Sequence, residues 1–296
     1  MSENILETRN LHYAYADGTI ALKGVSVGIE KGKCTAVLGG NGAGKSTMFL
    51  NFNGIHKPSS GEVLFNGSPI DYSRKGLKEL RSRVGIVFQD PDNQLFSASV
   101  FQDISFGVVN MRLPEDEARR RVNTAMERTG ITHLKDKPTH CLSFGQKKRA
   151  AIAGVLAMEP EVLVLDEPTA GLDPIGVSEL MRLLRQIQTE LGITVIISTH
   201  DIDIVPLYCD FVYVMNNGSI ILEGTPKQVF AEKEALRGVN LRLPRIGHLM
   251  EILKEKDEFE FDETANTISE ARAALKEWKR KHSDSGHQIT GADKVC

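Results

Sequence analysis

The run LSFGQKKRAAIAGVLAMEPEVLVLDEPTAGLDP, from Leu142 to Pro174, decides the fold of this chain. It places a Ser-x-Gly-Gln loop, a helical segment, a short apolar strand and an Asp-Glu pair in a fixed order. The strand is VLVL, from Val162 to Leu165, and such an unbroken apolar run is typical of a strand buried on both faces. We therefore expect Asp166 and Glu167 to lie at the end of a buried strand.

A glycine-rich loop, GGNGAGKST, lies earlier in the chain, after an apolar strand at Thr35 to Leu38 and before a helix that starts at Ser46. In this context the complete pattern G-x-x-x-x-G-K-S predicts a phosphate-binding loop, because glycines let backbone N–H groups wrap phosphates and a helix N-terminus attracts anions. We expect Lys45 to reach the β- and γ-phosphates and Ser46 to ligate Mg²⁺. The nucleotide-contacting residues are then Gly39, Gly40, Asn41, Gly42, Ala43, Gly44, Lys45, Ser46 and Thr47.

Polar side chains also end the neighbouring strands. Asp166 is suited to the Mg²⁺ shell, and Glu167 can orient or deprotonate an attacking water. Gln89 follows the strand VGIVF and His200 follows TVIIS. A lone His or Gln at a strand end is usually structural, but ligands bind at the carboxyl edge of parallel sheets, so we favour a functional role for both.

The order of segments predicts an α/β fold, because apolar strands alternate with helices. Residues 3–38 are β-rich, and helical charge patterning marks the stretch from 91 to 160. Residues 231–282 are rich in both charge signs, and the last residues, 283–296, predict a disordered tail. Within residues 231–282, one apolar stripe at helical spacing is formed by Ile268, Ala271, Leu275 and Trp278.

Composition narrows the class of protein. Of 296 residues, 41% are hydrophobic and 25% charged, with a mean hydropathy of −0.20, which are ordinary globular values. A net charge of −3 and a pI near 6.3 argue against a nucleic-acid partner. No stretch approaches the ~20 apolar residues of a membrane span, so we expect the chain to act at a membrane only through a partner.

Taken together, these motifs resemble the nucleotide-binding subunit of ATP-binding-cassette (ABC) transporters, over roughly residues 4–230. GGNGAGKST is similar to the Walker A motif, VLVLDE to Walker B and LSFGQ to the signature sequence. Gln89 matches the Q-loop, GLDP (Gly171 to Pro174) the D-loop and His200 the H-loop. The common signature is LSGGQ, and Phe144 replaces its first glycine here.

The resemblance implies a P-loop NTPase core of the ABC ATPase type at residues 1–230. That core would contain an antiparallel β subdomain and an inserted helical subdomain at about residues 91–160. A small α+β extension at residues 231–282 would help two copies of the chain to associate.

The resemblance also implies a mechanism in which two ATPase subunits close head to tail around two ATP molecules. Each ATP would lie between the Walker A loop of one subunit and the signature of the other. The residues serving the shared nucleotides would be Ser143, Gly145, Gln146 and Asp173. Catalysis would use Glu167, His200 and Gln89, and Mg²⁺ would be held by Ser46, Gln89 and Asp166. Tyr15 corresponds to the aromatic residue that stacks on adenine, with Tyr13 as the competing candidate.

The segment VFQDPDNQLFSASVFQDISFG is similar, more narrowly, to ATPases of energy-coupling-factor importers, and within them to cobalt/nickel uptake ATPases. That resemblance implies integral membrane transporter subunits as partners, a second ATPase subunit that is identical or related, and a peripheral location at the cytoplasmic face of the cell membrane. Leu95, Phe96 and Phe101 would line the groove for the membrane subunit or, with equal weight, pack the helical subdomain.

Three alternatives remain beside this interpretation. A vitamin importer could use a very similar ATPase. A soluble ABC-type ATPase acting on nucleic acid or ribosomes is disfavoured, because the chain has one cassette, no long heptad run and no basic arm. A regulatory module without catalysis is disfavoured by the presence of both Glu167 and His200.

Overall fold

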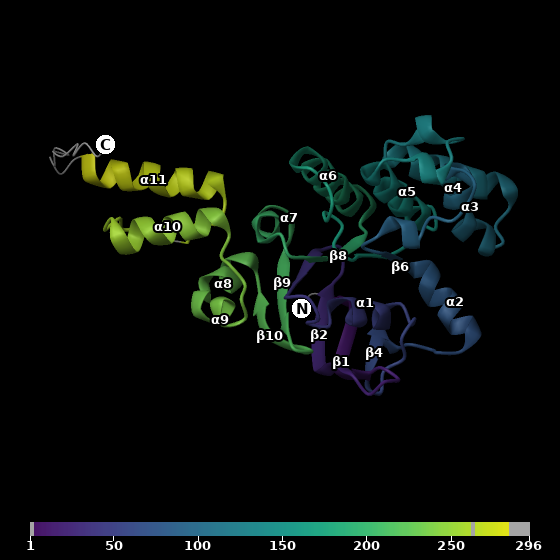
Figure 1. Cartoon of the computed structure of the whole chain (residues 1–296), viewed down its shortest axis with the longest axis horizontal. Coiled ribbons are helices and arrows are strands. Elements are labelled where there is room, and N and C mark those ends of the chain that lie inside the picture. The colour runs from purple at the N-terminus through teal and green to yellow at the C-terminus, as the bar shows by residue number, and fades with distance from the viewer. Residues whose placement is uncertain (1–2, 262–263, 284–296) are drawn as a thin grey trace. The chain divides into compact units, whose positions relative to one another are not determined.

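A computed structural model describes residues 3–261 and 264–283 (Figure 1). The chain divides between Thr225 and Pro226 into two compact units. The boundary that the sequence predicts, at residue 230, falls inside the first helix after this division, α8 (Pro226–Ala231).

The first unit is built on a six-stranded sheet. Its strands lie in the order β10 (Ser219–Gly224), β9 (Phe211–Asn216), β3 (Cys34–Leu38), β8 (Thr194–Thr199), β7 (Val162–Leu165) and β6 (Val84–Val87). All neighbours pair in parallel except β10, which is antiparallel to β9. The carboxyl ends of β3, β8, β7 and β6 therefore meet at one edge of the sheet, and the expected α/β class is confirmed.

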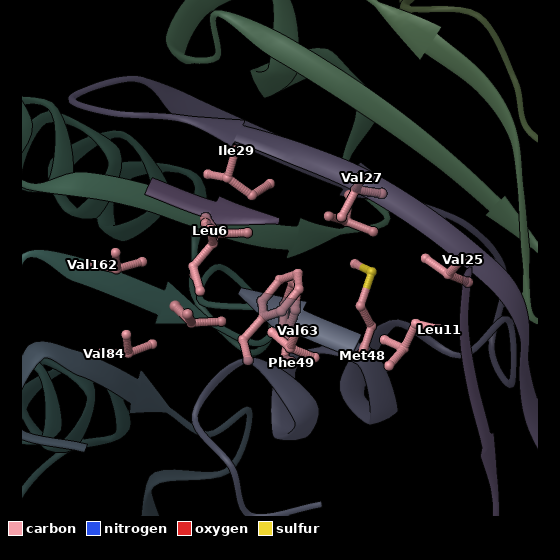
Figure 2. Packing of buried hydrophobic residues seen from close by; sticks show 14 of the residues in the cluster. Leu6, Leu11, Val25, Val27, Ile29, Met48, Phe49, Val63, Val84 and Val162 are labelled. Atoms are coloured by element: carbon pink, nitrogen blue, oxygen red, sulfur yellow. The ribbon is translucent and has the colours of Figure 1, made fainter. Parts of the chain in front are cut away.

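A second sheet is antiparallel, as predicted, with the order β2 (Ile20–Glu30), β1 (Asn4–Ala14), β4 (Ser60–Phe65) and β5 (Ser68–Pro69). Helix α1 (Lys45–Phe52) joins the two sheets through one hydrophobic cluster. Figure 2 shows Met48 and Phe49 of α1 among the buried Leu6 of β1, Val84 of β6 and Val162 of β7. This packing holds the start of α1, and with it the glycine-rich loop, against the parallel sheet.

The inserted helical subdomain is also present. After α2 (Arg74–Arg83), the helices α3 (Val100–Asn110), α4 (Glu115–Arg128) and α5 (Phe144–Leu156) pack on one another (Figure 1). A Cβ added at Gly85 of β6 would lie 2.1 Å from Val155 Cγ1 of α5. The missing side chain at Gly85 thus lets α5 approach the parallel sheet closely. Helices α6 (Pro174–Leu191) and α7 (Val205–Tyr208) complete the unit.

The second unit differs from the expectation of mixed helix and strand. Its described residues form four helices and no strand: α8, α9 (Lys233–Gly238), α10 (Arg245–Lys256) and α11 (Ile268–Ser283). The alternation of Phe259 and Phe261 with glutamates suggests a strand, yet no second strand is available among the described residues to pair with it. Instead the Phe259 ring stacks on Phe261, with centroids 5.7 Å apart, and contacts the Trp278 ring at a tilt, with centroids 4.4 Å apart.

The predicted apolar stripe on α11 is wrong in two of its four positions. Ala271 is buried and Trp278 is half-buried, but Ile268 and Leu275 are 75% and 38% exposed. The packed face runs through Ala271, Ala274 and Trp278, because small alanines let α11 approach α10 and the Phe259 ring. The predicted disordered tail lies outside the described residues except for Ser283, which ends α11.

Candidate active site

The glycine-rich loop runs from the end of β3 to the start of α1, as predicted. Gly39 and Gly44 have φ angles of 155° and 105°, and a Cβ there would lie 2.5 Å from Met215 O and 2.8 Å from Ala21 O. At Gly40 a Cβ would meet no described atom within 4 Å. Packing therefore requires glycine at positions 39 and 44, whereas the bare backbone at Gly40 is free for the close approach of a ligand.

Lys45 is buried at the first position of α1. Its Nζ donates to Gly39 O at 2.8 Å and to Gly40 O at 3.1 Å, and it lies 3.9 Å from Glu167 Oε1. The ammonium therefore sits between the glycine-rich loop and the carboxylate that follows β7. Of the other loop residues, Asn41 and Ser46 are exposed and Ala43 and Thr47 are buried.

Glu167 is the point at which the predicted catalytic side chains meet. Its Oε2 lies 2.9 Å from His200 Nδ1 and accepts a hydrogen bond from Gln89 Nε2 at 3.5 Å. The glutamate is 8% exposed and has a φ of 44°, a left-handed conformation that costs free energy for a residue with a side chain. The parallel topology thus brings Gln89, Glu167, His200 and Lys45 together from the ends of four adjacent strands.

Ser198 of β8 is a site residue that sequence analysis missed. Its Oγ donates to Asp166 Oδ1 and accepts a hydrogen bond from Glu167 N at 2.8 Å. One buried hydroxyl therefore orients the Asp166 carboxylate and the Glu167 peptide. The sequence around it, TVIISTH, marks a strand but not this contact, which exists only because β8 pairs with β7.

The oxygen donors nearby suit a hard divalent cation. Asp166 contributes a buried carboxylate, Ser46 an exposed hydroxyl and Gln89 an exposed amide oxygen. Magnesium prefers such ligands and keeps several waters when it also binds nucleotide phosphates. The residues present therefore fit Mg²⁺.

The two adenine-stacking candidates lie in different settings. Tyr15 is 39% exposed. Its hydroxyl forms a 2.8 Å hydrogen bond with Thr47 Oγ1 of the glycine-rich loop. Tyr13 instead stacks on His56, with centroids 4.5 Å apart, and packs against the hydrophobic cluster. The geometry favours Tyr15 as the open aromatic surface next to the loop.

A signature residue and a D-loop residue each cap a helix. Ser143 is the N-cap of α5 and forms a capping box with Gln146, while Asp173 caps α6 by accepting from Gly176 N at 2.6 Å. Both caps are exposed and make their hydrogen bonds within their own helix starts. A Cβ at Gly145 would meet Leu172 Cδ2 at an ordinary 3.6 Å, so the packing of this chain does not itself require that glycine.

Lys148, in the first turns of α5, is the second residue that sequence analysis missed. It is 3% exposed, and its Nζ donates to Gln89 O at 3.3 Å and to Glu167 O at 3.2 Å. Burial lowers the pKa of this ammonium to about 8, and the carboxylates of Glu167, Asp90 and Asp166 oppose that shift. In the sequence the residue is hidden within the charged run QKKR, which is typical of a solvated helix face.

Comparison with known proteins agrees with this geometry. A family model described as ABC transporter matches residues 22–170. The energy-coupling factor transporter ATP-binding protein EcfA3 of Clostridium perfringens is 70% identical over 281 residues, which cover 95% of this chain and 99% of that protein. The structure of cbiO1 from Clostridium perfringens, described as part of the ABC transporter complex cbiONQ, has a TM-score of 0.74 and 72% identity, covering 84% of this chain and 100% of that chain. A dimeric post-hydrolysis structure of the ATP-binding cassette MJ0796 with ADP and Pi has a TM-score of 0.68 and 27% identity. The match covers 75% of this chain and 98% of that chain.

The fold and the site define an ATPase of the ABC class, and the chain belongs to the ABC transporter family. Its similarity to EcfA proteins extends over almost its whole length and narrows the class of transporter within that family. The chain is an ATP-hydrolysing, ATP-binding subunit of the energy-coupling factor type.

Two further observations concern metals and membranes. In residues 3–261 and 264–283, no group of three or more His, Cys, Asp or Glu side chains is arranged to hold a metal ion. Among the helices described there, none combines the length and the apolar character needed to cross a bilayer.

Ser198→Ala is expected to destabilise the fold and to slow ATP hydrolysis, because it leaves the buried Glu167 N–H without its hydrogen-bond acceptor. We expect a loss of about 1–3 kcal/mol in unfolding free energy together with a lower turnover number. Thermal unfolding and steady-state ATPase assays measure the two effects. The control is Ser178→Ala, which removes an exposed hydroxyl bonded only to Pro174 O in its own helix. Equal behaviour of the two variants would contradict the role given to Ser198.

Proposed function

We propose that this subunit pairs with a second ATPase subunit around two ATP molecules and energises a membrane importer, most specifically one for cobalt or nickel ions. The observation that supports this proposal is the convergence of Lys45, Gln89 and His200 on the Glu167 carboxylate. ATP hydrolysis needs several groups close to the γ-phosphate. These are a cation that binds the phosphates, a carboxylate that orients the attacking water, and polar groups beside them.

Each residue has a defined task in this proposal. Backbone N–H groups of residues 39–44 and the Lys45 ammonium bind the phosphates, while Tyr15 stacks on the adenine. Ser46, Asp166 and Gln89 would hold Mg²⁺, which supplies positive charge beside the phosphate oxygens. Glu167 accepts the proton of the attacking water, and His200 orients that carboxylate through its 2.9 Å contact.

The signature completes the site of the second subunit. Ser143 uses its oxygen to cap α5, which leaves its hydroxyl proton for a phosphate. The spare room at Gly145 and the exposed start of α5 suit a γ-phosphate that approaches from another subunit. Asp173, exposed at the start of α6, would lie at the seam and help to position water.

Glu167→Gln is expected to keep ATP binding and to lower turnover by ~10²-fold or more, because the amide cannot accept a proton from water. The variant should accumulate as an ATP-bound dimer. Turnover assays, nucleotide-binding titrations and size-exclusion chromatography with ATP measure these outcomes. Wild-type turnover in the variant would remove Glu167 from its proposed role.

A groove next to the site offers a docking place for the membrane subunit. It has a volume of about 1010 Å³ and lies between α2 and the end of α3, and a smaller cavity that shares Arg81, Phe106 and Met158 continues it toward Gln94. Phe96 and Phe106 stack edge to face at this cavity, with centroids 4.8 Å apart, and are 67% and 53% exposed. Paired exposed aromatics suit an apolar helix of a membrane protein.

Leu95, Phe96 and Phe101, for which we gave equal weight to lining the docking groove and to packing the helical subdomain, lie in three different settings. Phe96 lines the smaller cavity, where the buried Asp103 carboxylate accepts from the N–H groups of Phe96 and Ser97 and holds that loop in place. Leu95 is 9% exposed and belongs to the hydrophobic core. Phe101 lies in a different cavity between α3 and α4, with Lys135 Nζ 4.7 Å from its ring centroid.

Phe96→Asp is expected to abolish recovery of the integral membrane partners when the chain is purified from native membranes, with at least about tenfold less partner retained. ATP binding should stay at the wild-type level. Leu207→Asp is the matched control, since Leu207 is 59% exposed but lies on α7. Normal partner recovery with Phe96→Asp would place the docking surface elsewhere.

Identification of the recovered partners by mass spectrometry tests the cargo. A metal-binding membrane subunit would support cobalt or nickel. A vitamin-binding subunit would support the alternative importer. In either case the chain would work at the cytoplasmic face of the cell membrane.

The second unit is proposed to strengthen the pairing of two subunits, identical or related. It exposes Leu249 of α10 and both Ile268 and Leu275 of α11. Ile268 and Leu275 are one heptad apart, so they lie on the same side of α11. Such apolar residues on neighbouring helices suit contact with a second copy.

The double variant Ile268→Glu with Leu275→Glu is expected to raise the dimer dissociation constant by about tenfold or more, since a buried leucine or isoleucine contributes ~1.5–3 kcal/mol. Analytical ultracentrifugation measures this, and ATP affinity should not change. Arg272→Glu with Lys276→Glu, on the same helix, controls for added negative charge. An unchanged dimerisation constant in the first variant would refute the role of this surface.

A further inference from the structure

Lys148 is a buried cation whose hydrogen bonds go to carbonyl groups. It is 3% exposed, and its ammonium donates to Gln89 O and Glu167 O at 3.3 and 3.2 Å. Burying a charge is costly unless it is paired and hydrogen-bonded. A methionine would fill a similar volume without this cost, so hydrophobic packing alone gives no reason for a lysine here.

The two carbonyl groups belong to separate elements of the active site. Gln89 follows β6, and Glu167 follows β7 with its backbone in the left-handed region. Lys148 itself lies on α5, the helix that Ser143 caps. One ammonium group on α5 therefore links two loops to that helix. The first loop follows β6 and begins at Gln89, and the second follows β7 and contains Glu167.

Phe144 holds this ammonium from the other side. Its ring centroid lies 5.2 Å from Lys148 Nζ, within the range of a cation–π interaction. The same ring packs on Gly171, where an added Cβ would lie 2.7 Å from Phe144 Cε1. Phe144, which stands where the common signature has its first glycine, thus has a partner within its own chain, and it links the loop before Asp173 to Lys148.

From these contacts we infer that Lys148 is a positioning residue for ATP hydrolysis, with Phe144 as its clamp. By holding the carbonyl groups of Gln89 and Glu167, it fixes the peptides from which the two side chains project. The Gln89 amide and the Glu167 carboxylate then face the same water. This inference rests on the proposed function, because it assigns Lys148 a role through Glu167.

The test compares Lys148→Met, Lys148→Arg and Lys147→Met in the full chain. Lys147 is the matched control, since its ammonium pairs with Asp92 at 2.6 Å instead of with the active-site carbonyls. The assays are kcat and KM for ATP hydrolysis, equilibrium binding of ATP and the melting temperature Tm.

Lys148→Met is expected to lower kcat by about tenfold or more while KM for ATP changes by less than about threefold, because the glycine-rich loop is untouched. Its Tm should stay close to that of the wild type, since the cost of burying a charge is removed together with two hydrogen bonds. Lys148→Arg should restore kcat to within about threefold, because a guanidinium can donate to two carbonyl groups at once. Lys147→Met should keep the wild-type kcat.

Two results would overturn the inference. One is a wild-type kcat in Lys148→Met. The other is a fall in both Tm and kcat that Lys148→Arg does not repair, since this is the behaviour of a merely structural lysine. Failure of the proposed function would appear separately, as undiminished turnover in Glu167→Gln.

Discussion

The negative charge of Glu167 is the constraint around which the active site is arranged. A carboxylate that is 8% exposed needs hydrogen-bond donors and positive charge nearby. Lys45 and the pair Gln89 and His200 supply them to its two oxygens. Its backbone is also strained, and Ser198 and Lys148 hold the N–H and the carbonyl of that residue. Strain at an active site persists only where the surrounding structure over-determines it, and these contacts do so.

The site therefore joins parts of the chain that have different tasks. The segment from Gln89 to Phe96 runs from the Glu167 carboxylate to the pair of Phe96 and Phe106 at the smaller cavity, and Asp103 anchors its far end to α3. If the two ends move together, a displacement at one end would reach the other, because packed interfaces switch between discrete arrangements. In the function that we propose, ATP hydrolysis at Glu167 and movement at the docking surface would be coupled through this segment.

Sequence analysis found those parts of the site whose chemistry is local. The glycine-rich loop and the acids after VLVL are recognisable because a phosphate cradle and a strand-end carboxylate each need adjacent residues. Ser198 and Lys148 could not be found in this way, since their partners are set by strand pairing and by the docking of α5 on the sheet. The stripe on α11 failed for a related reason. Helical spacing allowed more than one face, and the small size of Ala271 and Ala274, not the hydrophobicity of Ile268, decided which face packs.

The exposed pair Phe96 and Phe106 has a consequence for the life of the subunit before assembly. A copy that has not met a membrane partner presents two large aromatic rings to water, and such surfaces attract chaperones and proteases and promote aggregation. Surplus copies should therefore be cleared faster than assembled ones. The surface that we propose for docking would then also match the number of ATPase subunits in the cell to the number of importers.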